Sequence, residues 1–224
     1  MTDKKKQTKA PAGEGGRVSP GLLKKRADKV LELLRLRYPH PETHLTATNP
    51  WELLVATVLA AQCTDERVNK VTPALFQKWP GTRELAGADI LELESCIRST
   101  GFYHNKASNL IAAAKRVEEV YGGRVPDRME DLVTLPGVAR KTANVVLFGA
   151  FGRNEGLAVE AHVGRIANRV GLASAKHAKK TERELMELFP REEWGNVNDR
   201  LVGFGRHDCR DRNPLCAECE MNGF

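Results

Sequence analysis

The sequence of 224 residues lacks an apolar run of about 18 residues, the length that a helix needs to cross a membrane. The lysines near its start are not followed by the apolar stretch that a secretory signal requires. It also shows no convincing polar–apolar alternation of the kind that marks a β-strand, and no internal repeat. These absences favour a cytoplasmic, all-α protein without membrane contact, and a hydrophobic content of 41% provides for a substantial core.

An excess of acidic residues is absent as well, because the formal net charge is +6. This charge is concentrated at the start: residues 1–26 contain eight lysines and arginines against two acidic residues, which leaves the other 198 residues neutral overall. Residues 1–18 are predicted to be a disordered basic tail, which is either merely solvated or adds salt-dependent affinity for phosphates. Specific binding of nucleic acid must therefore depend on individually placed residues.

Helical patterns dominate the rest of the chain. Asn49 and Pro50 provide start signals for a strongly apolar helix, and Glu52 follows three residues after the cap. Glycine and proline separate several of the other helices. The predicted helices cover residues 20–37, 50–63, 66–79, 87–99, 104–121, 127–134, 140–151, 160–171, 177–189 and 192–206. We predict two domains, which comprise residues 44–153, with six helices, and residues 19–43 together with 154–224.

The stretch LPGVARKTANVV, residues 135–146, predicts a tight turn followed by a helix that begins with Arg140 and Lys141. A helix N-terminus carries a partial positive charge, so acidic residues rather than two cations are usual there. The Pro-Gly pair permits a sharp turn, because Gly137 tolerates a positive φ. The N–H groups of Gly137 and Ala139 should then point outward and bind an anion, for which the phosphate of a nucleic-acid backbone is the natural ligand.

Several stretches together resemble the endonuclease III family, bifunctional DNA glycosylases that remove oxidised pyrimidines. They are AAQCTDERVNK (60–70), GFYHNKA (101–107) and VPDRMEDLVTLPGVARKTANVVLFGAFG (125–152), the last containing the family's helix-hairpin-helix. The resemblance runs from about residue 20 to the terminal cysteines. It implies a two-domain fold with a six-helix barrel and a helical iron–sulfur-type domain. It also implies a bacterial-type, nucleoid-associated monomer that binds double-stranded DNA with an oxidised pyrimidine or abasic site.

The resemblance assigns the family's nucleophile to Lys141. Attack on C1′ of the damaged nucleotide would release the base, form a Schiff base and nick the strand by β-elimination. A lysine must lose its proton before it can attack, and both the positive helix end and the adjacent Arg140 disfavour the ammonium form. A monofunctional glycosylase would lack this lysine, so Lys141 argues against that class.

The family pairs this lysine with an aspartate in a V-D-T-H segment, where this sequence has VEAH after one extra residue. The catalytic aspartate position therefore falls on Glu160, and Ala161 replaces the threonine. Glutamate is one methylene longer, which displaces its carboxylate by roughly 1.5 Å unless the extra residue compensates. An active variant, a catalytically impaired DNA-damage-binding protein and a substrate-trapping variant of the fold remain open. His162 is expected to make a structural hydrogen bond rather than to act as a general base.

The resemblance also assigns residues that contact DNA. Gln62 and Phe102 map to the residues that fill the gap left by a flipped-out nucleotide, and Asp65 maps to a residue that lines the base pocket. For Gln62 the alternative is an ordinary polar residue at a helix end, and for Phe102 it is a core aromatic. Arg140 in the hairpin is a further candidate DNA contact, and Arg210 and Arg212 lie in a loop that the resemblance brings near the DNA backbone.

Three of the five cysteines, Cys209, Cys216 and Cys219, gather at the end of the sequence. In a cytoplasmic protein such a group favours metal binding over disulfides. The family binds a [4Fe–4S] cluster through C-x6-C-x2-C-x5-C, and three of the four positions match. The fourth falls at position 225, one residue beyond the sequence given. A sequence cut before its last ligand, a degenerate site and a zinc site that uses His207 remain open.

Overall fold

The structure, a computed structural model, describes residues 19–41, 43–175 and 177–223. The described residues form helices and loops without a β-strand among them, which confirms the predicted all-α class. The predicted basic tail of residues 1–18 lies outside the described residues. None of the described helices has the length and apolar character needed to span a membrane.

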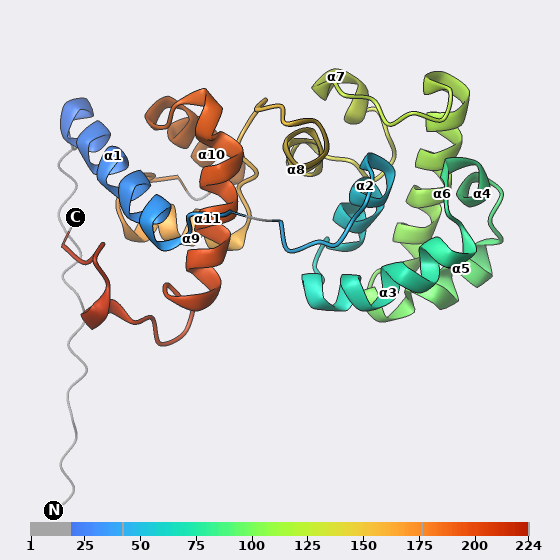
Figure 1. The fold of residues 1–224 in the computed structure, drawn as a ribbon, viewed down its shortest axis with the longest axis horizontal. Coiled ribbons are helices and arrows are strands. Elements are labelled where there is room, and N and C mark those ends of the chain that lie inside the picture. Colours follow the sequence, from blue (N-terminus) through green and yellow to red (C-terminus); the bar gives the residue numbers. More distant parts are fainter. Residues whose placement is uncertain (1–18, 42, 176, 224) are drawn as a thin grey trace, which may run out of the picture.

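The helices form two lobes that lie side by side (Figure 1). The first lobe consists of α2 (Pro50–Leu59), α3 (Asp65–Lys78), α4 (Thr82–Ala86), α5 (Ile90–Ile97), α6 (Tyr103–Tyr121), α7 (Met129–Leu132) and α8 (Arg140–Phe151). The second consists of α1 (Pro20–Arg37), α9 (Ala161–Arg169), α10 (Ala178–Leu188) and α11 (Trp194–His207). Short 3₁₀ segments are η1 (Arg98–Thr100), η2 (Arg191–Glu193) and η3 (Cys216–Glu218). α2 and α8 lie on the side of the first lobe that faces α11 (Figure 1).

Each lobe has its own hydrophobic core. The core of the first lobe is built around α2, which is apolar on nearly all sides and buries eight of its ten residues. The core of the second lobe gathers apolar residues from α1, α9, α10 and α11. These two cores fall in the sequence ranges of the two predicted domains, whose boundaries stay a prediction.

Local signals account for most of the helix ends. The Asn49 side chain accepts a hydrogen bond from the Glu52 N–H at 3.0 Å, and Glu52 in turn accepts from the Thr48 N–H at 2.7 Å. This reciprocal pair fixes the start of α2, as the sequence predicts. α8 has the predicted bounds, because a left-handed Gly152 stops it.

Two features differ from the prediction, and the described first lobe has seven helices, α2 to α8, instead of the predicted six. α2 ends at Leu59, whereas the sequence predicted a helix to residue 63, so Gln62 lies on a turn beyond the helix with φ 53°. The helix α4 was not predicted, because it has five residues and its N-cap, Gly81, supplies no side-chain hydrogen bond. Such a short element gives no periodic pattern in the sequence.

Candidate active site

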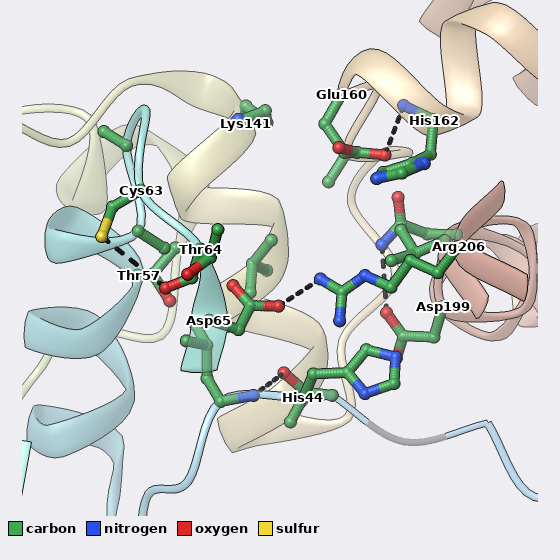
Figure 2. A pocket seen from close by; sticks show the side chains of 18 of the residues that line it. His44, Thr57, Cys63, Thr64, Asp65, Lys141, Glu160, His162, Asp199 and Arg206 are labelled. Atoms are coloured by element: carbon green, nitrogen blue, oxygen red, sulfur yellow. Dashed lines mark hydrogen bonds and ion pairs between the residues drawn. The ribbon is translucent and has the colours of Figure 1, made fainter. Parts of the chain in front are cut away.

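A cleft of about 750 Å³ lies between the two lobes. Its walls combine the turn after α2, the start of α3 and the first turn of α8 with the segment before α9 and one face of α11. Figure 2 shows Lys141 and Glu160 on opposite walls at one end of this cleft. The two residues that the sequence assigns to the chemistry therefore share one cavity, although each belongs to a different lobe.

Lys141 is held at the start of α8 by the hairpin that precedes it. Gly137 has φ 79° and lies against Asn109, so the turn requires a residue without a side chain. Ala139 is the N-cap and supplies no side-chain hydrogen bond to the first turn. Among the described residues, the N–H groups of Gly137 and Ala139 donate to no protein acceptor. The hairpin therefore offers free amides beside an exposed Lys141 at the positive end of a helix.

Glu160 is the N-cap of α9. Its Oε1 accepts hydrogen bonds from the N–H groups of His162, at 2.8 Å, and Val163, at 3.2 Å. These bonds fix the carboxylate at the helix end, where the helix dipole favours negative charge. α9 therefore keeps an N-cap although Ala161 lacks the threonine hydroxyl, because the Glu160 side chain supplies the capping bonds.

Arg140 has a different environment from the one that the sequence suggested. Its Nε donates to both carboxylate oxygens of Glu182 on α10, at 3.0 and 3.2 Å, and its Nη2 donates to the Glu155 carbonyl at 3.1 Å. Asn144, one turn further along α8, donates to Glu182 at 3.0 Å. Glu182 is 8% exposed. The Glu182 carboxylate therefore balances the guanidinium charge that the sequence places next to Lys141.

The segment between α8 and α9 passes directly over this ion pair. A Cβ atom added to Gly156 would lie 2.3 Å from Glu182 Oε1 and 2.6 Å from Asn144 Nδ2. The position therefore requires glycine for close approach rather than for an unusual φ. One cluster of polar side chains thus fixes α8, which carries Lys141, against the segment that leads to Glu160.

Asp65 lines the cleft, as the resemblance implies, and it also forms an ion pair with Arg206 of α11. This pair joins the two lobes across the cleft (Figure 2). Asp199, seven residues before Arg206 on α11, lines the same cleft. Burial raises the pKa of its carboxyl group to about 6. The Asn198 amide, at 3.0 Å, and the nearby Arg200 act in the opposite direction.

His162 has the surroundings of a structural residue. Its Nδ1 lies 2.9 Å from Nη2 of Arg165, and its ring packs against α11 so closely that a Cβ on Gly205 would lie 2.8 Å from Nδ1. Arg165 also donates to the carbonyl of Gly205 at 2.9 Å. These contacts favour the predicted hydrogen-bonding role over a catalytic one.

Gln62 and Phe102 lie on turns outside the set of residues that line the cleft. Phe102 is 62% exposed, which excludes the alternative of a core aromatic. It precedes α6 with φ 49°, and Gln62 follows α2 with φ 53°. Both side chains are therefore presented to solvent by turns that have left-handed backbone conformations.

The loop with Arg210 and Arg212 is attached to α9. Arg169 donates to the carbonyls of Arg210, at 2.6 Å, and Asp211, at 3.1 Å, while Arg165 donates to the Cys209 carbonyl at 2.9 Å. Arg210 and Arg212 are both exposed. The loop thus presents two cations to solvent and is anchored through its backbone.

The three terminal cysteines, Cys209, Cys216 and Cys219, are free thiols. Thiolates are the right ligands for an iron–sulfur cluster, but a cluster needs four. Within residues 19–41, 43–175 and 177–223, no three histidine, cysteine, aspartate or glutamate side chains, His207 included, come together to hold a metal ion. The residues present therefore do not complete a site for a [4Fe–4S] cluster or for zinc.

Sequence reasoning missed Glu182, Arg206 and Asp199. Glu182 lies 42 residues after its partner Arg140, and Arg206 lies 141 residues after Asp65. No local spacing signals such pairs. The burial of Asp199 likewise depends on how the lobes meet.

Known proteins with the same architecture act on DNA. Residues 55–191 match the HhH-GPD superfamily of base excision DNA repair proteins. The chain is 50% identical over 198 residues to endonuclease III of Synechocystis sp., covering 88% of this chain and 90% of that protein. It is 44% identical over 185 residues to endonuclease III of Bacillus subtilis, covering 82% and 84%. A solved structure of a non-covalent endonuclease III–DNA complex superposes with a TM-score of 0.85 at 39% identity, covering 88% of this chain and 92% of that one.

Proposed function

The chain belongs to the HhH-GPD superfamily of base excision DNA repair proteins, and from this membership we propose how its residues carry out the reaction. It is a DNA glycosylase and abasic-site lyase of the endonuclease III family, and it acts on duplex DNA. The proposal concerns the roles of Lys141, Glu160 and the DNA-contacting residues, and oxidised pyrimidines as the bases removed. The observation that carries it is the position of Lys141 and Glu160 on opposite walls of one cleft.

Lys141 supplies the nucleophile. Its neutral Nζ forms a bond to C1′ as the glycosidic bond breaks, and the base leaves with the electron pair and takes up a proton. Opening of the sugar ring then gives a protonated Schiff base between Nζ and C1′. Loss of a proton from C2′ breaks the C3′–O bond, so the strand on the 3′ side leaves with a phosphate at its 5′ end and the backbone is nicked. Water finally hydrolyses the Schiff base and frees the lysine.

Glu160 supplies the negative charge on the opposite wall. Positive charge develops on the sugar as the base leaves, and a fixed carboxylate stabilises it because the carboxylate needs little reorganisation. Two N–H donors hold one oxygen of Glu160, at 2.8 and 3.2 Å, and leave the other oxygen available to the cleft. The length of this side chain determines the rate, since a displacement of about 1 Å can cost on the order of a hundredfold.

The DNA backbone is bound on either side of the cleft. The free amides of Gly137 and Ala139 bind a phosphate at the start of α8, and this contact does not depend on the base sequence of the DNA. Arg210 and Arg212 contact the backbone from the loop of the second lobe. Asp65 lines the pocket that receives the flipped-out base.

Borohydride trapping on a duplex with one abasic site tests the role of Lys141. Reduction of the Schiff base should give a covalent adduct that is lost in Lys141→Gln. The control Lys179→Gln removes an exposed lysine from α10 and should keep the adduct. An adduct that persists in Lys141→Gln would refute the assignment.

Nicking and binding assays on the same abasic duplex distinguish an active enzyme from a DNA-damage-binding protein at Glu160. Glu160→Asp and Glu160→Gln are compared with the parent chain for nicking rate and for duplex affinity. We expect nicking by the parent chain and a large loss in Glu160→Gln with affinity retained. Tight binding to abasic duplex without nicking by the parent chain would instead identify the DNA-damage-binding alternative.

A further inference from the structure

The ammonium group of Lys106 lies in the interior of the first lobe. Lys106 is 5% exposed, and its Nζ donates to the carbonyl oxygens of Leu59, at 2.7 Å, and Thr100, at 2.8 Å. Burial lowers the pKa of this lysine. Lysine is almost never fully buried unless its charge has partners, so these two carbonyls are the reason that it can remain there.

The two carbonyls belong to the ends of two separate helices. Leu59 is the last residue of α2, and Gln62 follows it on the next turn. Thr100 ends η1, and Phe102 follows it two residues later. The last carbonyls of a helix lack partners within the helix, and a cation there satisfies them. One ammonium group therefore fastens the bases of both turns to each other.

The backbone of these turns needs such an anchor. Among the described residues, the non-glycine residues with positive φ are Gln62, Phe102 and Asn213. A non-glycine residue in the left-handed region is strained and persists there only when its surroundings hold it. The Lys106 side chain supplies a contact to each turn, since its Nζ donates to the carbonyl of Leu59, three residues before Gln62, and to that of Thr100, two residues before Phe102.

We propose that Lys106 is a positioning residue that fixes the Gln62 and Phe102 turns relative to each other, so that both side chains enter the duplex as one unit. The inference rests on the proposed function, in which these side chains fill the gap left by the flipped-out nucleotide. A wedge and a gap-filling amide must arrive at a fixed separation, because adjacent stacked bases have a fixed spacing. Packing alone would be served by an apolar residue at position 106, whereas joining two carbonyls requires a donor.

The test compares Lys106→Met with Lys115→Met, which removes an exposed lysine from the same helix. Each is measured on a duplex that contains an oxidised pyrimidine. Each is also measured on a duplex in which the nucleotide opposite an abasic site is missing, so that no gap must be filled. A third duplex carries 2-aminopurine opposite an abasic site, and its fluorescence reports unstacking of that base on binding, whether or not the strand is cleaved.

Lys106→Met should lower kcat/KM on the paired lesion by about a hundredfold, as expected for misplaced groups. It should abolish the 2-aminopurine signal and leave trapping on the gapped abasic duplex close to that of the parent. The combination with Phe102→Ala or Gln62→Ala should add little to the single loss, because the residues act through one contact unit. Lys106→Gln, which keeps an uncharged NH₂ donor group on a shorter side chain, should lie between Lys106→Met and the parent, and Lys115→Met should match the parent.

The outcome separates this inference from the proposed function. If the parent chain forms no adduct on the gapped substrate, the proposed chemistry fails, yet the 2-aminopurine signal still tests Lys106. Equal losses on paired and gapped substrates would overturn the inference, since they would show a general structural role. The inference also fails if neither Lys106→Met nor Lys106→Gln folds by circular dichroism, because the residue would then serve the core alone.

Discussion

Replacement of Glu182 by glutamine tests whether the Arg140 cluster aligns the two halves of the cleft. Glutamine keeps the shape but turns one acceptor oxygen into an NH₂ group that faces the donors of Arg140 and Asn144. A lost hydrogen bond to a charged group costs about 1.5–3 kcal/mol. The Arg140 side chain is 45% exposed and can regain water, so we expect a loss of about 1.5–2 kcal/mol in the free energy of unfolding. For a chain of this size that corresponds to a Tm lower by roughly 3–8 °C.

The effect on catalysis should exceed the effect on stability. Arg140 precedes Lys141, and Glu182 also touches the segment that leads to Glu160, so the substitution loosens both reacting groups together. A shift of about 1 Å between them would lower the single-turnover nicking rate by about a hundredfold. The rate is measured on a preformed abasic duplex at one common temperature that lies well below the Tm of every variant, so that every sample is folded. Glu187→Gln, an exposed position on the same helix, is the matched control and should behave like the parent.

A comparison with Arg140→Gln decides between two roles for the arginine. If Arg140 acts only through Glu182, the two single variants and the double variant should show the same loss. If Arg140 instead binds phosphate, Glu182→Gln would release it and tighten duplex binding, whereas Arg140→Gln would weaken it. A parent-like nicking rate in Glu182→Gln, with its Tm lowered, would refute the alignment argument.

The remaining predictions concern Asp199, which lines the cleft, and Gly156, which lies against Glu182. The pKa of Asp199 is raised from 3.8 to about 6, so the folded state holds its proton more tightly and the stability contribution falls as pH rises between these values. Asp199→Asn should therefore be more stable than the parent above pH 7, by on the order of 2–3 kcal/mol, with the difference vanishing below about pH 4 in urea unfolding. An unchanged pH profile would contradict the burial of this carboxyl. Gly156→Ala should lose about 1–3 kcal/mol, because its Cβ would meet Glu182 at 2.3 Å. The control Gly21→Ala, whose Cβ would have no atom within 4 Å, should show no loss. Thermal melts of both variants measure the difference.

Local chemistry in the sequence predicts the helices and the hairpin well. Asn49, Pro50 and Gly152 mark helix ends through contacts within a few residues, so the sequence contains the whole signal. The turn at Gly137 is predictable for the same reason. The class of fold and the position of Lys141 at a helix start follow from these local patterns.

The sequence does not predict what joins the lobes. The sequence suggested that Arg140 is a repulsive neighbour of Lys141, but its partner Glu182, from the other lobe, balances that charge. The end of α2 was missed because the residues after Leu59 are good helix formers, while the Lys106 ammonium binds the Leu59 carbonyl from 47 residues away. The roles assigned to Gln62 and Phe102 come from resemblance and stay predictions.

The two residues that we propose to react lie on different lobes, Lys141 on the first and Glu160 on the second, and each lobe has its own hydrophobic core. The free energy that holds them in register is therefore that of the contact between lobes, which is smaller than the free energy of unfolding either core. Activity sets a stricter requirement than folding, because a chain with both cores intact becomes inactive once the lobes separate. Substitutions that abolish repair while leaving thermal stability nearly unchanged should accordingly concentrate where the two lobes meet.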